Sequence, residues 1–304
     1  MPRSPYLSPI RNSSETLPTR SRRTLAAIVK KLFVLALLVA ACSRSESPSI
    51  DAALSAELDR LDASLKTMKQ SNLATMHAEA IAKARAAKTP ELKLYRMRDA
   101  WIGVHTLQFI HEHPAANTDM AQMEALWNER GPTIEEKPSP HGSLLQRALI
   151  EAASNRAEKL YRASLPYGKT AGPGDGLYYL AEADANAEFG KWTASLPGEG
   201  EAQTYALDEP TQALEQDMLK AFAADPSGKT TIPVSTRLKE SRELHDRYLD
   251  DGAALMLVEA RMRLERASDE NLPAQLEQLG GTPIKVVSKK PASVKITLVR
   301  WPYT

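Results

Sequence analysis

Residues 50–68 read Ile-Asp-Ala-Ala-Leu-Ser-Ala-Glu-Leu-Asp-Arg-Leu-Asp-Ala-Ser-Leu-Lys-Thr-Met. The apolar residues of this stretch recur at intervals of four and three positions, at Leu54, Leu58, Leu61, Leu65 and Met68. Such spacing predicts a helix with a single apolar stripe along one face. Because the pattern lasts only about two heptads, it favours the seam of a helical bundle over a long coiled coil.

The rest of the chain is punctuated by helix start and stop residues. Thr89-Pro90-Glu91 combines a capping residue, a proline at the first helical position and an acid in the first turn, which predicts a helix start. Gly131-Pro132 and Pro166 are expected to end helices. The expected helices cover, in approximate bounds, residues 50–68, 73–88, 90–113, 118–131, 144–165, 175–196, 209–224, 236–267 and 273–279.

The last part of the chain has a different pattern. Residues 284–288 and 294–300 are rich in β-branched side chains, and Lys289-Lys290-Pro291-Ala292 between them suits a turn. This predicts a β-hairpin within residues 282–304. The expected fold class is therefore mainly α, an irregular antiparallel bundle or a stack of helical hairpins over residues 50–281, with a small C-terminal β-hairpin.

Two connections share a residue pattern. Ala163-x-x-Pro166-x-Gly168-Lys169-Thr170-x-x-Pro173 is matched sixty positions later by Ala223-x-x-Pro226-x-Gly228-Lys229-Thr230-x-x-Pro233. Both stretches are expected to be loops between helices. A duplicated unit is one interpretation, and the general use of proline and glycine at helix ends is the other.

Upstream of the helices, residues 32–41 form a ten-residue apolar run preceded by Lys30 and Lys31 and followed by Cys42. A basic flank, a short apolar run and small residues at its end describe an export signal. Ten helical residues span only about 15 Å, half of a bilayer core, so a membrane-spanning helix is not expected here.

The string Val39-Ala40-Ala41-Cys42 resembles the lipobox of bacterial lipoproteins, although leucine is more usual where Val39 stands. The resemblance implies cleavage before Cys42, a diacylglycerol on its thiol and an acyl chain such as palmitate on its new amine. It thus implies a signal peptide over residues 1–41 and a polar tether over residues 42–49. Ser43 in place of aspartate implies transfer to the outer membrane, with the body facing the periplasm.

Composition limits the possible partners. The whole chain holds 39 Lys+Arg and 38 Asp+Glu, and removing residues 1–41, with seven basic groups and one acid, leaves 32 against 37, a net charge of −5. An acidic body argues against nucleic acid as a partner, since phosphate binding needs a basic surface. Cys42 is the only cysteine, so no intramolecular disulfide can form.

No stretch of the sequence forms a convincing catalytic or metal site. Gly-Lys-Thr occurs twice, but the glycine that a phosphate loop needs is replaced by Ala163 and Ala223. The histidines near residue 111 lack metal-ligand spacing. The carboxylates Glu182, Asp184 and Glu188 are more typical of a solvated helix face than of an acid–base pair. We therefore predict no catalytic residue, no cofactor and no metal.

The function expected from these observations is that of a lipid-anchored scaffold or assembly module that binds another envelope protein. Tyr167, Tyr178 and Tyr179, beside the expected Gly-rich loop 168–176, are the predicted contact residues, because exposed aromatic side chains suit protein recognition. Two alternatives remain open. One is an inhibitor or immunity-type lipoprotein against a cell-wall enzyme. The other is a cell-wall-acting enzyme that uses the helix carboxylates or the cluster of His105, His111, Glu112 and His113.

Overall fold

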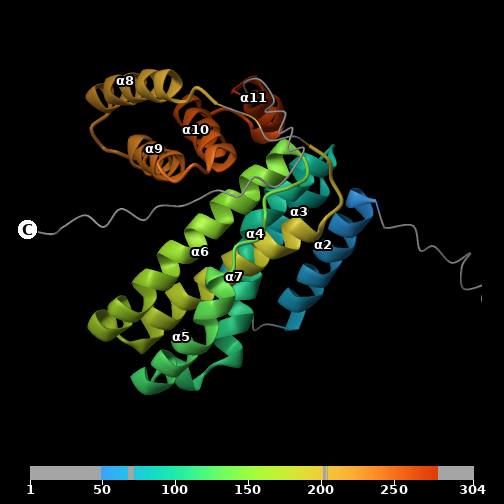
Figure 1. The fold of residues 1–304 in the computed structure, drawn as a ribbon, viewed down its shortest axis with the longest axis vertical. Coiled ribbons are helices and arrows are strands. Elements are labelled where there is room, and N and C mark those ends of the chain that lie inside the picture. Colours follow the sequence, from blue (N-terminus) through green and yellow to red (C-terminus); the bar gives the residue numbers. More distant parts are fainter. Residues whose placement is uncertain (1–48, 68–71, 201–202, 204, 280–304) are drawn as a thin grey trace, which may run out of the picture. The chain divides into compact units, whose positions relative to one another are not determined.

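The computed structural model describes residues 49–67, 72–200, 203 and 205–279. Within these ranges the chain forms α-helices and short 3₁₀ turns but no β-strand (Figure 1), so the prediction of a mainly helical fold is confirmed. No helix in the same ranges is long and apolar enough to cross a bilayer. The predicted signal peptide, Cys42 and the predicted hairpin over 282–304 lie outside the described residues.

The first four helices begin within two residues of the positions that the sequence pattern predicts. They are α2 (Ile50–Thr67), α3 (Asn72–Arg85), α4 (Pro90–Glu112) and α5 (Met120–Glu135). All four leucines of the α2 stripe are buried. Thr89 caps α4 as predicted, because its hydroxyl oxygen accepts a hydrogen bond from the Leu92 amide at 3.2 Å.

The longest helices, α6 (Leu144–Ala171) and α7 (Pro173–Ser195), are joined by a single residue, Gly172, with φ +135°. They run antiparallel and touch through small side chains. A Cβ on Gly176 would lie only 2.6 Å from the Gly168 Cα, and a Cβ on Gly190 would lie 3.6 Å from the Ser154 Oγ. Small residues at these positions let the two backbones approach and make this pair the centre of the molecule.

The remaining helices are α8 (Asp208–Ala224), α9 (Thr231–His245), α10 (Asp250–Glu265) and α11 (Leu272–Leu279). α9 packs against α10, and α10 in turn packs on α6 (Figure 1). Gly252, near the start of α10, lies against α6, because a Cβ there would come within 3.0 Å of the Glu151 Cβ.

Two apolar clusters fill the interior. The larger one includes residues from α2, α4, α6, α7, α9 and α10, with Met97, Phe189 and Leu257 among its fully buried side chains. The smaller one joins the end of α4 to α5, α6 and α7. There the Trp127 ring stacks on the Tyr161 ring with a centroid distance of 4.6 Å, and its Nε1 donates a hydrogen bond to the Tyr161 carbonyl oxygen at 3.0 Å.

Two expected helix ends are wrong. α5 continues through Gly131-Pro132 to Glu135, where the absent Cβ of Gly131 makes room for the Tyr161 hydroxyl. α6 continues through Pro166, so the expected Gly-rich loop 168–176 is helical apart from Gly172. A proline inside a helix costs about 3 kcal/mol, and the close packing of α6 on α7 compensates for it.

The expected helix over 236–267 is in fact two helices, α9 and α10, separated by a turn over 246–249. Tyr248 in that turn has φ +58°, a left-handed conformation that ends α9. The Leu249 amide donates a hydrogen bond to the Leu244 carbonyl oxygen at 3.0 Å and closes the turn. Residues 236–267 contain no proline and only one glycine, Gly252, which is why the sequence alone does not reveal the break.

Candidate functional site

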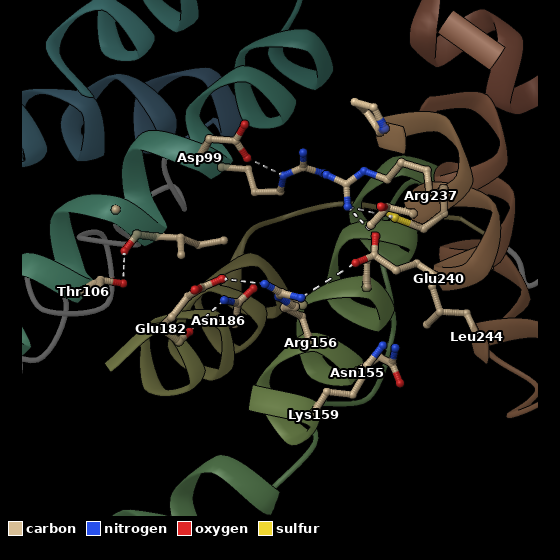
Figure 2. Close-up of a pocket in the computed structure, with 18 of the residues that line it drawn as sticks. Asp99, Thr106, Asn155, Arg156, Lys159, Glu182, Asn186, Arg237, Glu240 and Leu244 are labelled. Carbon is tan, nitrogen blue, oxygen red and sulfur yellow. Dashed lines mark hydrogen bonds and ion pairs between the residues drawn. The ribbon is translucent and has the colours of Figure 1, made fainter. Parts of the chain in front are cut away.

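A groove of about 640 Å³ lies where α9 and α10 face α3, α4, α6 and α7 (Figure 2). Helical periodicity brings its lining residues to one side of each helix. On α7 these are Tyr178, Glu182 and Asn186, each four positions from the next, and on α9 the line runs from Ile232 to Leu244. At 1.5 Å per residue, the groove therefore follows about 12 Å of α7 and about 18 Å of α9.

Small residues form part of the lining. Ala152 and Ala153 of α6 lie beside Gly103 of α4. A larger residue in place of Gly103 would clash with His77 as it lies here, because an added Cβ would come within 1.9 Å of the His77 ring. The His77 ring is buried against the glycine, and this burial lowers its pKa below the ordinary value of 6.5 while the Asp99 charge opposes the shift.

A continuous line of ion pairs, which we call the charge ladder, passes from α4 over α10, α9 and α6 to α7. Its members, in order, are Asp99, Arg98, Glu259, Arg237, Glu240, Arg156 and Glu182. The nitrogen–oxygen distances between neighbours range from 2.5 Å to 3.9 Å. Figure 2 shows Arg156 reaching from α6 toward Glu182 on one side and Glu240 on the other.

Glu259 is the most buried member of the charge ladder, with a side chain only 2 % exposed. Arg98 donates a hydrogen bond to its Oε1 at 2.7 Å, and the Arg237 Nε lies 2.9 Å from its Oε2. The second contact is a close ion pair without hydrogen-bond alignment. Burial disfavours the carboxylate, but the two guanidinium groups outweigh it and lower the pKa of Glu259.

Three exposed apolar side chains line the groove. Met76, Tyr178 and Ile232 are among the large apolar side chains that the described part of the chain exposes to solvent, and all three line the groove. They come from three different helices, α3, α7 and α9. Exposed apolar groups around a concave site mark a surface that another molecule covers.

The predicted tyrosines lie close together, although on helices and not on a loop. The Tyr167 and Tyr179 rings meet edge to face with centroids 4.9 Å apart, and the Tyr179 and Tyr178 centroids are 6.4 Å apart. Of the three, only Tyr178 lines the groove. The other two extend an aromatic surface from the groove along the contact between α6 and α7.

The carboxylates of α7 do not act together. Glu182 faces the groove, whereas Asp184 is buried on another side of the helix and accepts a hydrogen bond from the Arg130 Nε at 2.7 Å. Burial raises the pKa of Asp184, and Arg130 opposes the shift. Glu188 forms an ion pair with Lys191 at 3.6 Å and does not line the groove.

The histidines of α4 are also separate from the groove. His105 stacks on Trp101 with a centroid distance of 3.7 Å, and its Nε2 lies 2.6 Å from the Arg60 Nη2. Burial and the Arg60 charge lower the pKa of His105 to about 4, so the ring is neutral at physiological pH. The His113 Nδ1 lies 2.8 Å from the Phe109 carbonyl oxygen. Among the described residues no three His, Cys, Asp or Glu side chains come together as metal ligands.

Sequence reasoning missed most residues of the groove. Tyr178 and Glu182 were predicted for other reasons, but the three arginines of the charge ladder come from three helices, α4, α6 and α9, that are far apart in the sequence. The available clue was the spacing of four on α7 and α9, which marks one helix face. No protein family, curated protein or solved structure matches this chain.

Proposed function

We propose that this protein is a lipid-anchored envelope protein that binds a segment of another protein in the groove between α9–α10 and α4–α6–α7. The observation that supports it most directly is that three exposed apolar side chains, Met76, Tyr178 and Ile232, line this groove. Aromatic and large aliphatic side chains at a concave surface are the usual anchors of protein recognition.

The size of the groove agrees with such a role. A volume of 640 Å³ is within the range of about 300–1,000 Å³ in which proteins bind ligands. A length of about 12–18 Å corresponds to about three turns of helix or to about five extended residues. The groove therefore suits one short segment of a larger partner.

The chemistry of the lining favours binding over catalysis. The cell-wall-enzyme alternative requires Asp184, Glu188 or His105 in a pocket, and none of these residues lines the groove. Asp184 is paired with Arg130, and His105 is stacked on Trp101. The polar groups that do line the groove are mostly paired with one another in the charge ladder.

The membrane anchor is proposed from the sequence of residues 30–42. Acyl chains on Cys42 would attach the body to the outer membrane, since each buried CH₂ contributes about 0.8 kcal/mol and two or three chains give a stable anchor. Residues 43–49 would act as a tether that lets the groove face partners in the periplasm.

Photo-crosslinking tests the groove. A photoreactive amino acid placed at Tyr178 or Ile232 of the full chain, in cells that produce it, is expected to form adducts with one envelope protein. The control position is Tyr248, which is 90 % exposed and does not line the groove. Adducts that are absent at both groove positions, or that form equally at Tyr248, would contradict the proposal.

Metabolic labelling tests the anchor. The unmodified chain is expected to incorporate radioactive palmitate and to sediment with outer membranes. Cys42→Ala is expected to lose the label and to accumulate with its signal peptide still attached. An unlabelled wild-type chain would refute the anchor and leave the groove proposal standing.

A further inference from the structure

We infer that the groove selects an acidic, amphipathic peptide segment, an inference that rests on the proposed binding function. The groove contains side chains of both charges, so the decisive quantity is which of them remain accessible to a ligand. Five cations and three carboxylates line the groove, namely Arg98, Arg156, Lys159, Arg237, Arg263, Asp99, Glu182 and Glu240.

The carboxylates are largely used within the protein. The side chain of Glu240 is 14 % exposed and that of Glu182 is 22 % exposed, and arginines of the charge ladder contact both. The side chain of Asp99 is more exposed, at 76 %, but it also forms an ion pair, with the Arg98 Nε at 3.0 Å. A basic ligand would therefore have to compete with the arginines of the protein for these acids.

The cations differ in availability. The side chains of Arg156 and Lys159 are 43 % and 38 % exposed, but Arg156 is paired with Glu182 and Lys159 with Glu243. Arg263, on α10, is exposed and has no ion-pair partner within 4 Å among the described residues. A ligand carboxylate can therefore reach Arg263 without displacing an ion pair of the protein.

Arg263 lies on α10, and the exposed apolar residues Met76, Tyr178 and Ile232 come from α3, α7 and α9. A segment that fits must place apolar side chains on these three residues and a carboxylate toward Arg263. Since every carboxylate that lines the groove is already paired, the unpaired cation favours an acidic segment over a basic one.

Selection from a random dodecapeptide phage library on the immobilised full chain tests this inference. Peptides that bind the wild-type chain but not the Tyr178→Ala/Ile232→Ala variant are groove ligands. They are expected to contain at least twice as many Asp and Glu residues as the input library. Neutral or basic groove ligands would overturn the inference and leave the proposed function intact, whereas no groove ligand at all would overturn both.

A charge-reversal pair then tests the cations directly. With a selected peptide labelled with fluorescein, Arg263→Glu is expected to weaken binding at least about tenfold at low salt and less at high salt, because salt screens exposed charges. Lys220→Glu makes the same charge change on α8, outside the groove, and is expected to alter the affinity less than twofold. Equal effects of the two variants would contradict the inference.

Vesicles of phosphatidylglycerol provide the remaining test, because acidic lipids offer phosphate charge and apolar chains to the same groups. The selected peptide is expected to bind with unchanged affinity when vesicles are added. Displacement of the peptide from the wild-type chain, but not from Arg263→Glu, would show that the groove binds lipid and would overturn the peptide assignment.

Discussion

α6 packs against α7 and against α10, and the two contacts use different chemistry. Toward α7 the contact is made of small residues, with Gly168 and Gly176 so close that a Cβ would overlap the opposite backbone. Toward α10 it also contains buried polar pairs, with the Arg147 Nε donating to the Asp251 Oδ2 at 2.7 Å and Glu151 accepting from the Gly252 amide at 2.8 Å. The first contact depends on shape, and the second depends on polar pairing as well as on the close approach at Gly252.

The difference matters for the groove, which is lined by α6 and α7 on one side and by α9 and α10 on the other. The α6–α7 contact tolerates no change of separation, because close-packed backbones resist deformation. The α6–α10 contact also contains discrete polar pairs, which can be removed one at a time. The wall of the groove formed by α9 and α10 is therefore the part that mutation can loosen without unfolding the rest.

The largest expected loss of stability comes from a substitution in the contact between α6 and α10. Arg147→Met leaves the Asp251 carboxylate buried, with the Tyr205 hydroxyl at 2.5 Å as its remaining partner. Breaking a buried ion pair on one side costs about 3–5 kcal/mol, so the free energy of unfolding should fall by that amount in urea titrations followed by circular dichroism.

The matched control is Arg162→Met on the same helix, whose side chain is 72 % exposed. Exposed ion pairs contribute about 0–1 kcal/mol, so this variant should be nearly as stable as the wild type. If both arginine variants lost the same stability, the α10 contact would not depend on the buried pair.

The second effect is at the shape-dependent contact. Gly176→Val places a branched side chain 2.6 Å from the Gly168 Cα and 2.9 Å from the Ser164 carbonyl oxygen, both of which are backbone atoms that cannot rotate away. Overpacking of this kind costs about 3 kcal/mol, measured by the same urea titration. Ser195→Val, at an exposed position of α7, should change stability by less than about 0.5 kcal/mol.

The third effect depends on pH and belongs to the charged contact alone. Burial raises the pKa of Glu151 to about 7, and the nearby Asp250 and Asp251 charges add to the shift while the Gly252 amide and Arg147 oppose it. Since the folded state binds this proton more tightly than the unfolded state, the contribution of Glu151 to stability falls as pH rises from about 4.5 to about 7.

The free energy of unfolding of Glu151→Gln should therefore exceed that of the wild type by about 1–3 kcal/mol at pH 8 and equal it at pH 4.5. Glu158, two turns further along α6, serves as the control. Burial disfavours the charged form of Glu158, but hydrogen bonds from Lys137 and Arg247 outweigh this and lower its pKa to about 2. Glu158→Gln should thus differ from the wild type by a constant amount between pH 5 and pH 8, and a slope there would contradict the assignment.

The same contrast explains what the sequence could predict. The apolar stripe of α2 and the Thr89 cap of α4 depend on neighbouring residues, and both were predicted. The course of α6 through Pro166 was not, because it depends on packing against Gly176 of another helix. The groove was not predictable either, since Arg98 and Glu259 are 161 positions apart and meet only after α10 has packed on α6.

The two connections with a common residue pattern show this most directly. At residues 163–173 the pattern is helical up to Ala171, whereas at residues 223–233 it forms a turn between α8 and α9. The residue before proline differs, because Leu165 stays in the helix while Asp225 is extended and accepts a hydrogen bond from the Ser227 amide at 3.0 Å. Like residue patterns thus give different structures where the tertiary contacts differ.

The smallest expected effect is in the second of these connections. Gly228 has φ +73°, so Gly228→Ala should cost about 1 kcal/mol from backbone strain alone. The nearest atom to an added Cβ is the Ile232 Cδ1 at 2.8 Å, the end of an exposed, flexible side chain that can move away. Gly228→Asn should recover most of the loss, because asparagine tolerates the left-handed region. If Gly228→Ala instead destabilised the protein as much as Gly176→Val, the turn would be packed as tightly as the α6–α7 contact, and the distinction between the two regions would fail.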